Sequence, residues 1–289
     1  MTARRVVPLL GLILLSGLTL GAAAHAGDGL HRVSFLHGHP QAAIAGIEVR
    51  AALLKDLASG EVLYERAAAR RLPPASLTKI MSALVVLDGR DLFETVTVTP
   101  EAAAHPPSKI GIAEGEQYRL IDLLAAMLIT SANDACLAVA MHVAGTEERF
   151  AQLMNAKAAA LQLDDSHFVN ACGFDHPRHY SSARDLARLA EVALDDPTFA
   201  LIVRIAQLEI ARLDRQRQIM LFNTNYLLSN EQVTGVKTGF TNRAGRCLIA
   251  TAENSDRRLI LVGLNIRDRW YSSQELLRYG FELPVVGGR

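Results

Sequence analysis

The sequence contains few lysines, and its charges balance. Its 30 basic residues are 25 arginines and five lysines, at positions 55, 79, 109, 157 and 237. Any motif that requires lysine is therefore uncommon by composition alone. The 30 acidic residues cancel the basic ones, which argues against a nucleic-acid partner, because such binding relies on a strongly basic surface. Half of the 289 residues are hydrophobic, which excludes an intrinsically disordered chain.

Long hydrophobic runs are absent except at the N-terminus. There, Arg4 and Arg5 precede the apolar run 6–20, and small residues follow it. This pattern is typical of an export signal, so we expect residues 1–26 to be a signal peptide and the mature chain to begin at Gly27. An uncleaved membrane anchor is the alternative, although a spanning helix needs about 20 apolar residues. The expectation is an exported, periplasmic protein.

Only three cysteines are present, Cys136, Cys172 and Cys247, and an odd number cannot pair completely. Export would place them in an oxidising compartment. Cys136 lies in an apolar helical stretch and Cys247 in a strand-like one, which favours buried, unpaired thiols that pack as small hydrophobic side chains. A disulfide that includes Cys172 is the alternative.

Short apolar strands are predicted near both ends of the chain, with helices between them. The expected strands are residues 51–57, 61–65, 232–239, 246–253 and 258–266. The expected helices are residues 76–87, two within 118–144 that are separated near 130–133, then 147–161, 183–194 and 275–281. This order predicts a single α+β domain, in which strands from the two termini form one antiparallel sheet and a helical part is inserted between them.

Two of the five lysines lie in compact polar motifs, Ser76-Leu-Thr-Lys79 and Lys237-Thr238-Gly239. Residues three apart share one face of a helix, so Ser76 Oγ and Lys79 Nζ can approach each other, and Ser76 can also cap the helix. A serine nucleophile needs an adjacent base, and a desolvated lysine can be neutral enough to serve, whereas arginine cannot. Taken alone, however, Ser76 is more often a plain helix cap and Lys79 a solvated residue.

Between these two in the chain lies a further motif, Ser131-Ala132-Asn133, which interrupts the apolar helical stretch and is the second of the three in sequence order. These three motifs, in this order, form the signature of penicillin-binding proteins and class A β-lactamases. The chain resembles the serine D-alanyl-D-alanine carboxypeptidases, which are low-molecular-mass penicillin-binding proteins. The resemblance covers nearly all of the mature chain and is carried by residues 53–64, 73–83, 131–136, 173–177, 180–186 and 235–247.

The resemblance implies a β-lactamase/transpeptidase-like fold and a set of catalytic roles. Ser76 would attack the carbonyl of the penultimate D-alanine and become the acyl-ester, while Lys79 accepts its proton. Ser131 would relay a proton toward Lys79 or the departing amine, and the Asn133 amide would orient the peptide backbone.

The third motif would bind the end of the substrate. The resemblance implies that Lys237 holds the terminal carboxylate, with Thr238 Oγ beside it, and that Gly239 lets the strand approach the peptide. The backbone N–H groups of Ser76 and Phe240 would form the oxyanion hole. The implied partners are peptidoglycan stem peptides, with β-lactams as covalent inhibitors, and neither a metal nor a cofactor is expected.

Two features depart from the family pattern. Many relatives continue into a small β-domain and an amphipathic anchoring helix, whereas this sequence stops at Arg289. We therefore expect a lead segment at 27–45 and a catalytic domain at 46–289, without a C-terminal β-domain or a stable membrane anchor. Residues 105–108, His-Pro-Pro-Ser, replace the usual Gly/Ser-rich loop, and Phe240 is bulky, so the substrate preference stays open.

Three other functions share parts of this motif pattern: an endopeptidase, a β-lactamase and a non-catalytic penicillin-binding protein. An endopeptidase that cuts D-alanyl cross-links would use the same atoms, so the motifs do not separate it from a carboxypeptidase. A class A β-lactamase needs a glutamate after the second motif, and the sequence has none from 149 to 190, so penicillin should inhibit rather than be turned over. Intact Ser76, Lys79 and Lys237 argue against a non-catalytic penicillin-binding protein.

The sequence lacks the motifs of zinc peptidases and of α/β-hydrolases. The pairs His37/His39 and His176/His179 invite a zinc peptidase, but no HExxH sequence is present,. GxSxG, the nucleophile motif of α/β-hydrolases, is missing as well,. The sequence therefore favours serine catalysis without a metal.

Overall fold

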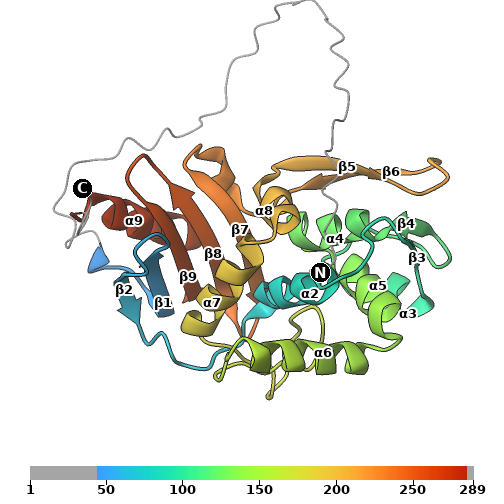
Figure 1. Cartoon of the computed structure of the whole chain (residues 1–289), viewed down its shortest axis with the longest axis horizontal. Coiled ribbons are helices and arrows are strands. Elements are labelled where there is room, and N and C mark those ends of the chain that lie inside the picture. Colours follow the sequence, from blue (N-terminus) through green and yellow to red (C-terminus); the bar gives the residue numbers. More distant parts are fainter. Residues whose placement is uncertain (1–43, 285–289) are drawn as a thin grey trace, which may run out of the picture. The chain divides into compact units, whose positions relative to one another are not determined.

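The computed structural model describes residues 44–284, so the expected signal peptide and nearly all of the lead segment lie outside the described residues. A five-stranded sheet organises this part of the chain, in the order β2-β1-β9-β8-β7 with all neighbours antiparallel (Figure 1). Its strands are β1 (Val49–Asp56), β2 (Val62–Arg66), β7 (Val233–Thr241), β8 (Gly245–Glu253) and β9 (Arg258–Ile266). The predicted α+β fold, with one sheet built from both ends of the chain, is confirmed.

The sheet is buried on both faces. Successive residues of a strand point to opposite sides, so Leu53 joins one hydrophobic cluster and Leu54 the other, as do Ile260 and Leu261. On one face, α9 (Arg269–Glu282) packs against β9 and β1, and on the other α7 (Ala183–Leu194) packs against the same strands. Covering both faces explains why these strands read as continuous apolar runs rather than alternating ones.

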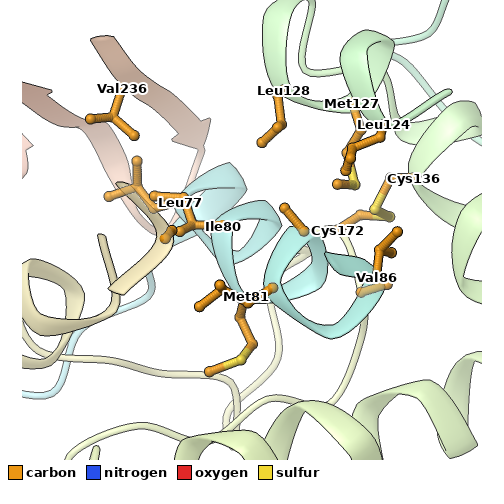
Figure 2. Close-up of a cluster of buried hydrophobic side chains, with 14 of the residues drawn as sticks. Leu77, Ile80, Met81, Val86, Leu124, Met127, Leu128, Cys136, Cys172 and Val236 are labelled. Atoms are coloured by element: carbon orange, nitrogen blue, oxygen red, sulfur yellow. A yellow bond between two sulfur atoms is a disulfide. The ribbon is translucent and has the colours of Figure 1, made fainter. Parts of the chain in front are cut away.

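The remaining helices form the inserted helical part. They are α2 (Lys79–Leu87), α3 (Pro100–Ala103), α4 (Leu120–Ile129), α5 (Asn133–Ala144), α6 (Glu147–Ala160) and α8 (Pro197–Arg204). Helix α2 runs through the middle of the larger cluster, where Ile80, Met81 and Val86 have no exposed surface. Figure 2 shows Leu124 and Leu128 from α4 gathered beside it. The start of α2 is therefore held rigidly between the helical part and the sheet.

Several predicted boundaries need correction. The expected helix 76–87 begins as a 3₁₀ turn, η1 (Ala75–Thr78), and only Lys79–Leu87 is α-helical. Ser76 is not the N-cap, because it lies inside this turn, which packs against β7. Helix α9 is longer than the predicted 275–281, because the Asp268 side chain caps it by accepting from the N–H of Tyr271,.

Two small antiparallel strand pairs were not predicted. They are β3 (Thr95–Thr97) with β4 (Gln117–Arg119), and β5 (Gln207–Ala211) with β6 (Gln218–Phe222). Their strands have only three to five residues, too few for a clear periodic pattern.

None of the helices in the described range is long and apolar enough to cross a membrane.

The favoured interpretation of the cysteines is wrong for two of the three. Cys136 and Cys172 form a disulfide with their Cα atoms 6.0 Å apart, a normal separation for such a bond,. Cys136 lies on α5 and Cys172 in the loop before α7, two segments that meet only in the folded protein. Cys247 is a buried free thiol as predicted.

Candidate active site

The first motif places a serine hydroxyl against a buried amine. Lys79 Nζ lies 3.0 Å from Ser76 Oγ, within hydrogen-bond distance. The 3₁₀ turn brings the two side chains together at the point where α2 begins. Two further acceptors face the same nitrogen at 2.8 Å, Asn133 Oδ1 and the carbonyl oxygen of Cys172. Lys79 has no exposed surface, yet no carboxylate is hydrogen-bonded to it in the described chain.

These surroundings favour the neutral amine. Burial lowers the pKa of Lys79 well below its usual value, and the positive charge of Lys237 lowers it further,. A neutral amine has two N–H donors and one lone pair. Because Asn133 Oδ1 and the Cys172 carbonyl can accept both donors, the lone pair is left to face Ser76 Oγ. The geometry suits the removal of a proton from that hydroxyl.

The second motif forms the turn between α4 and α5. Ser131 adopts a left-handed conformation with φ 62°, and Asn133 is the first residue of α5. The N–H of Asn133 donates to the carbonyl oxygen of Ser108 at 2.7 Å. Asp134 then accepts from the N–H groups of residues 110–112. The unusual 105–108 segment is thus tied to the second motif, and its Pro107 and Ser108 line the cleft.

The third motif lies on β7. Lys237 is 1% exposed, and its Nζ donates to the carbonyl oxygen of Thr238 at 3.0 Å. Burial, together with the positive charge of Arg269, lowers the pKa of Lys237 to about 7. The hydroxyl groups of Thr238 and Thr224 are 2.6 Å apart, which fixes the Thr238 side chain on the cleft side.

Gly239 allows β7 to approach the turn that carries Ser76. A Cβ atom built at this position would lie 3.1 Å from the carbonyl oxygen of Pro74 and 3.1 Å from the nitrogen of Ser76, closer than ordinary van der Waals contact. The next residue, Phe240, is 60% exposed at the edge of the cleft. A side chain larger than hydrogen at 239 would therefore separate the strand from the serine.

The three motifs meet at one cleft of about 910 Å³. Six of the eight predicted residues line it, namely Ser76, Ser131, Asn133, Thr238, Gly239 and Phe240. The remaining two, Lys79 and Lys237, are buried behind its wall. The structure thus brings together all of the residues that the sequence predicted for the site.

Other contributors were missed. Arg269 lines the cleft from the start of α9, and its Nη1 donates to the carbonyl oxygens of Gly239 at 3.1 Å and Cys247 at 3.2 Å. Thr224 contacts the Thr238 hydroxyl, and the Cys172 carbonyl accepts from Lys79. None of these residues belongs to one of the three motifs, and a backbone carbonyl has no sequence signal at all, so only the fold could reveal them.

One of the histidines considered as metal ligands, His179, is buried within a hydrogen-bond network. His37 and His39 lie outside the described residues. His179 is 2% exposed, with Nε2 2.8 Å from Thr78 Oγ1, and its Nδ1 accepts from the N–H of Val169. Burial lowers its pKa to about 3. A neutral His179 therefore links η1 to the loop before α7, with both ring nitrogens occupied.

The fold and the arrangement of the site define the class of protein. A solved Streptomyces DD-transpeptidase superposes with a TM-score of 0.76 at 27% identity, covering 82% of this chain and 98% of that one. A D-alanyl-D-alanine carboxypeptidase structure from Mycobacterium tuberculosis gives 0.78 at 29% identity, covering 83% and 94%. The protein thus has the fold of the penicillin-binding, DD-peptidase class.

Within this class the chain belongs to the peptidase S11 family, described as D-alanyl-D-alanine carboxypeptidase, whose pattern matches residues 39–268. The Escherichia coli D-alanyl-D-alanine carboxypeptidase DacC is 38% identical over 252 residues, which are 81% of this chain and 62% of the relative. The Bacillus subtilis DacF is 34% identical, with 74% and 57% covered. The chain therefore spans about 60% of the length of these relatives.

Proposed function

We propose that the protein is a serine D-alanyl-D-alanine carboxypeptidase that removes the terminal D-alanine from peptidoglycan stem peptides. The observation that carries this proposal is the 3.0 Å contact between Ser76 Oγ and the buried Lys79 Nζ, whose other two neighbours are hydrogen-bond acceptors. Family membership supports the reaction type, and the names of the carboxypeptidase relatives support the substrate.

The proposed reaction begins with proton transfer. Lys79 takes the proton of Ser76 as Oγ attacks the carbonyl carbon of the penultimate D-alanine, forming a tetrahedral intermediate. The backbone N–H groups of Ser76 and Phe240 stabilise its oxyanion. The C–N bond then breaks, and D-alanine leaves as its amine receives the proton from Lys79 through Ser131. Water hydrolyses the resulting acyl-ester and restores Ser76.

The substrate carboxylate would be held on the β7 side of the cleft. The pKa of Lys237 is about 7, so its charged form predominates below neutral pH, and an approaching carboxylate favours that form further. The Thr238 hydroxyl, fixed by Thr224, offers a second contact. An anion at this position would replace the weak acceptor that Lys237 now has, the carbonyl oxygen of Thr238.

A D-alanyl-D-alanine endopeptidase is the second candidate. A Pseudomonas aeruginosa protein of that name is 33% identical over 219 residues, which are 73% of this chain and 70% of the relative. Cleavage of a cross-link would use the same serine and lysine. The difference would lie in what the cleft accepts beyond the scissile bond, where Phe240 is bulky and the 105–108 segment departs from the family pattern.

Turnover of β-lactams is disfavoured by the surroundings of the ester. Asp175 is the one carboxylate among the described residues that line the cleft. Its oxygens already accept from Thr241 Oγ1 at 2.7 Å and from the N–H of Arg243 at 3.3 Å. These contacts hold the Asp175 carboxylate beside residues 241–243, and no glutamate lines the described cleft. Penicillin should therefore remain attached to Ser76 as a covalent inhibitor.

We place this activity in the periplasm, on the basis of the signal-like N-terminus and a peptidoglycan substrate. A first experiment incubates the purified protein with benzylpenicillin and maps the adduct by peptide mass spectrometry. We expect a penicilloyl group on Ser76 and none in Ser76→Ala. An unmodified wild-type protein would refute the proposal.

A second experiment separates the two peptidase activities. The enzyme is given a stem pentapeptide and, in parallel, a D-alanyl cross-linked dimer, and the products are resolved by chromatography. Release of free D-alanine from the pentapeptide supports the carboxypeptidase. Cleavage of the dimer alone would replace it with the endopeptidase.

A further inference from the structure

The disulfide lies next to the proposed general base. Lys79 Nζ has two acceptors besides the serine, and they come from segments distant in sequence: Asn133 at the start of α5, and the carbonyl of Cys172 in the loop before α7. The two residues are 39 positions apart in the chain, so only the folded structure sets the distance from one acceptor to the other. Both must be held in place for the lone pair of a neutral Lys79 to face Ser76.

The Cys136–Cys172 bond joins these two segments directly. Cys136 is three residues after Asn133, on the same face of α5,. Its partner Cys172 itself supplies the carbonyl acceptor. Both cysteines are 1% exposed, and Figure 2 shows them side by side next to α2. One covalent link therefore connects the segment of each acceptor.

We propose that Cys136 and Cys172 are positioning residues for catalysis, because their disulfide holds the two acceptors that orient the Lys79 amine. This inference rests on the proposed function of Lys79 as the base for Ser76. The disulfide takes no part in the bond changes. Its contribution is geometric, since a misplacement of about 1 Å can cost about 100-fold in rate.

Other contacts keep the loop folded without the disulfide. Ser82 Oγ donates to the carbonyl oxygen of Ala171 at 2.6 Å, and the N–H of Ala171 donates to Glu147 Oε1 at 3.0 Å. Asn170 Oδ1 accepts from the N–H of Gly173 at 2.7 Å. These contacts hold the residues on both sides of Cys172, so loss of the disulfide should loosen the Cys172 carbonyl rather than unfold the loop.

The test compares variants that break the link with one that removes a sulfur atom elsewhere. Cys136→Ala breaks the disulfide but keeps Cys172, and the double variant Cys136→Ala/Cys172→Ala removes both sulfurs. Cys247→Ala is the matched control, because Cys247 is equally buried but unpaired. Acylation by benzylpenicillin is followed by rapid quenching and mass spectrometry, and the rate is normalised to the number of sites that finally acylate.

We expect both disulfide variants to acylate about tenfold more slowly at saturating penicillin, with the half-saturating concentration within about twofold of wild type and Cys247→Ala unchanged. A purely structural role would lower the thermal midpoint without changing the rate per active site, and that result would overturn the proposal. Free thiols at both positions in the oxidised wild-type protein would do the same. Absence of wild-type acylation would instead refute the proposed function itself.

Discussion

The two sides of the cleft each bury a lysine, and the surroundings of the two amines differ. On the helical side, Lys79 faces Ser76 and two acceptors that accommodate a neutral amine. On the strand side, Lys237 Nζ has one hydrogen-bond acceptor among the described residues, the carbonyl oxygen of Thr238, and Arg269 adds positive charge nearby. The Lys79 amine therefore has three polar neighbours, whereas the Lys237 amine has one.

This difference shows that burial alone does not decide the role of a lysine. Desolvation lowers the pKa of both side chains,. In the proposed mechanism, the loss of charge makes Lys79 the base. The same desolvation destabilises the charged form of Lys237, which a bound substrate carboxylate would stabilise, so the proposed roles require opposite protonation states of the two amines.

Replacement of Lys79 should cause the largest loss of activity of the substitutions that test this comparison. Lys79→Arg keeps a positive charge but cannot supply a neutral base, so the acylation rate should fall about 1000-fold, within the range for loss of a general base. Lys237→Arg is the matched substitution on the strand side. It preserves the cation and should mainly raise KM. Equal losses of kcat in the two variants would contradict the division of roles.

Gly239→Ala tests the contact between the two sides. The new methyl group would lie 3.1 Å from the backbone of Pro74 and Ser76, so β7 or η1 must move. We expect kcat/KM to fall about 100-fold while the fold is retained, as measured by steady-state kinetics and circular dichroism. Full activity in this variant would show that the close approach is unnecessary.

The pH dependence of kcat/KM should reflect the protonation of both lysines. Activity requires neutral Lys79 and protonated Lys237, so it should fall on the acid side as Lys79 gains a proton and on the alkaline side as Lys237 loses one, near pH 7 in the free enzyme,. Arg269→Gln removes a positive charge, which should raise the pKa of Lys237. The alkaline limb of the pH profile should then shift to higher pH. An unmoved or lowered limb would contradict this electrostatic account.

A partly buried lysine outside the cleft, Lys55, provides the smallest expected effect. Lys55 Nζ contacts Glu191 at 2.8 Å, with side chains 24% and 17% exposed. Lys55→Met should change the free energy of unfolding by about 1 kcal/mol or less, measured by urea denaturation, and leave penicillin acylation unchanged. A large loss of acylation would mean that lysine replacement disturbs the site from a distance.

The strands of the sheet and the approach of Ser76 to Lys79 could be predicted because both have local sequence signals. Apolar runs marked the strands, and the spacing of Ser76 and Lys79 indicated their contact. The disulfide and the Cys172 carbonyl had no such signal, since they depend on helix α5 and the loop before α7 meeting beside α2. The expected helix cap at Ser76 was wrong because packing against β7 selects a 3₁₀ turn there.

The titration of the lysines tests the central claim most directly. With only five lysines in the chain, protein labelled with lysine carrying ¹³C at Cε gives few NMR signals, and the variants Lys79→Arg and Lys237→Arg assign two of them. We predict that the Lys237 signal titrates near pH 7 and that the Lys79 signal titrates well below the usual lysine range. Titration of Lys79 near 10.5, its value in an unperturbed environment, would contradict the proposed role of this residue as the base.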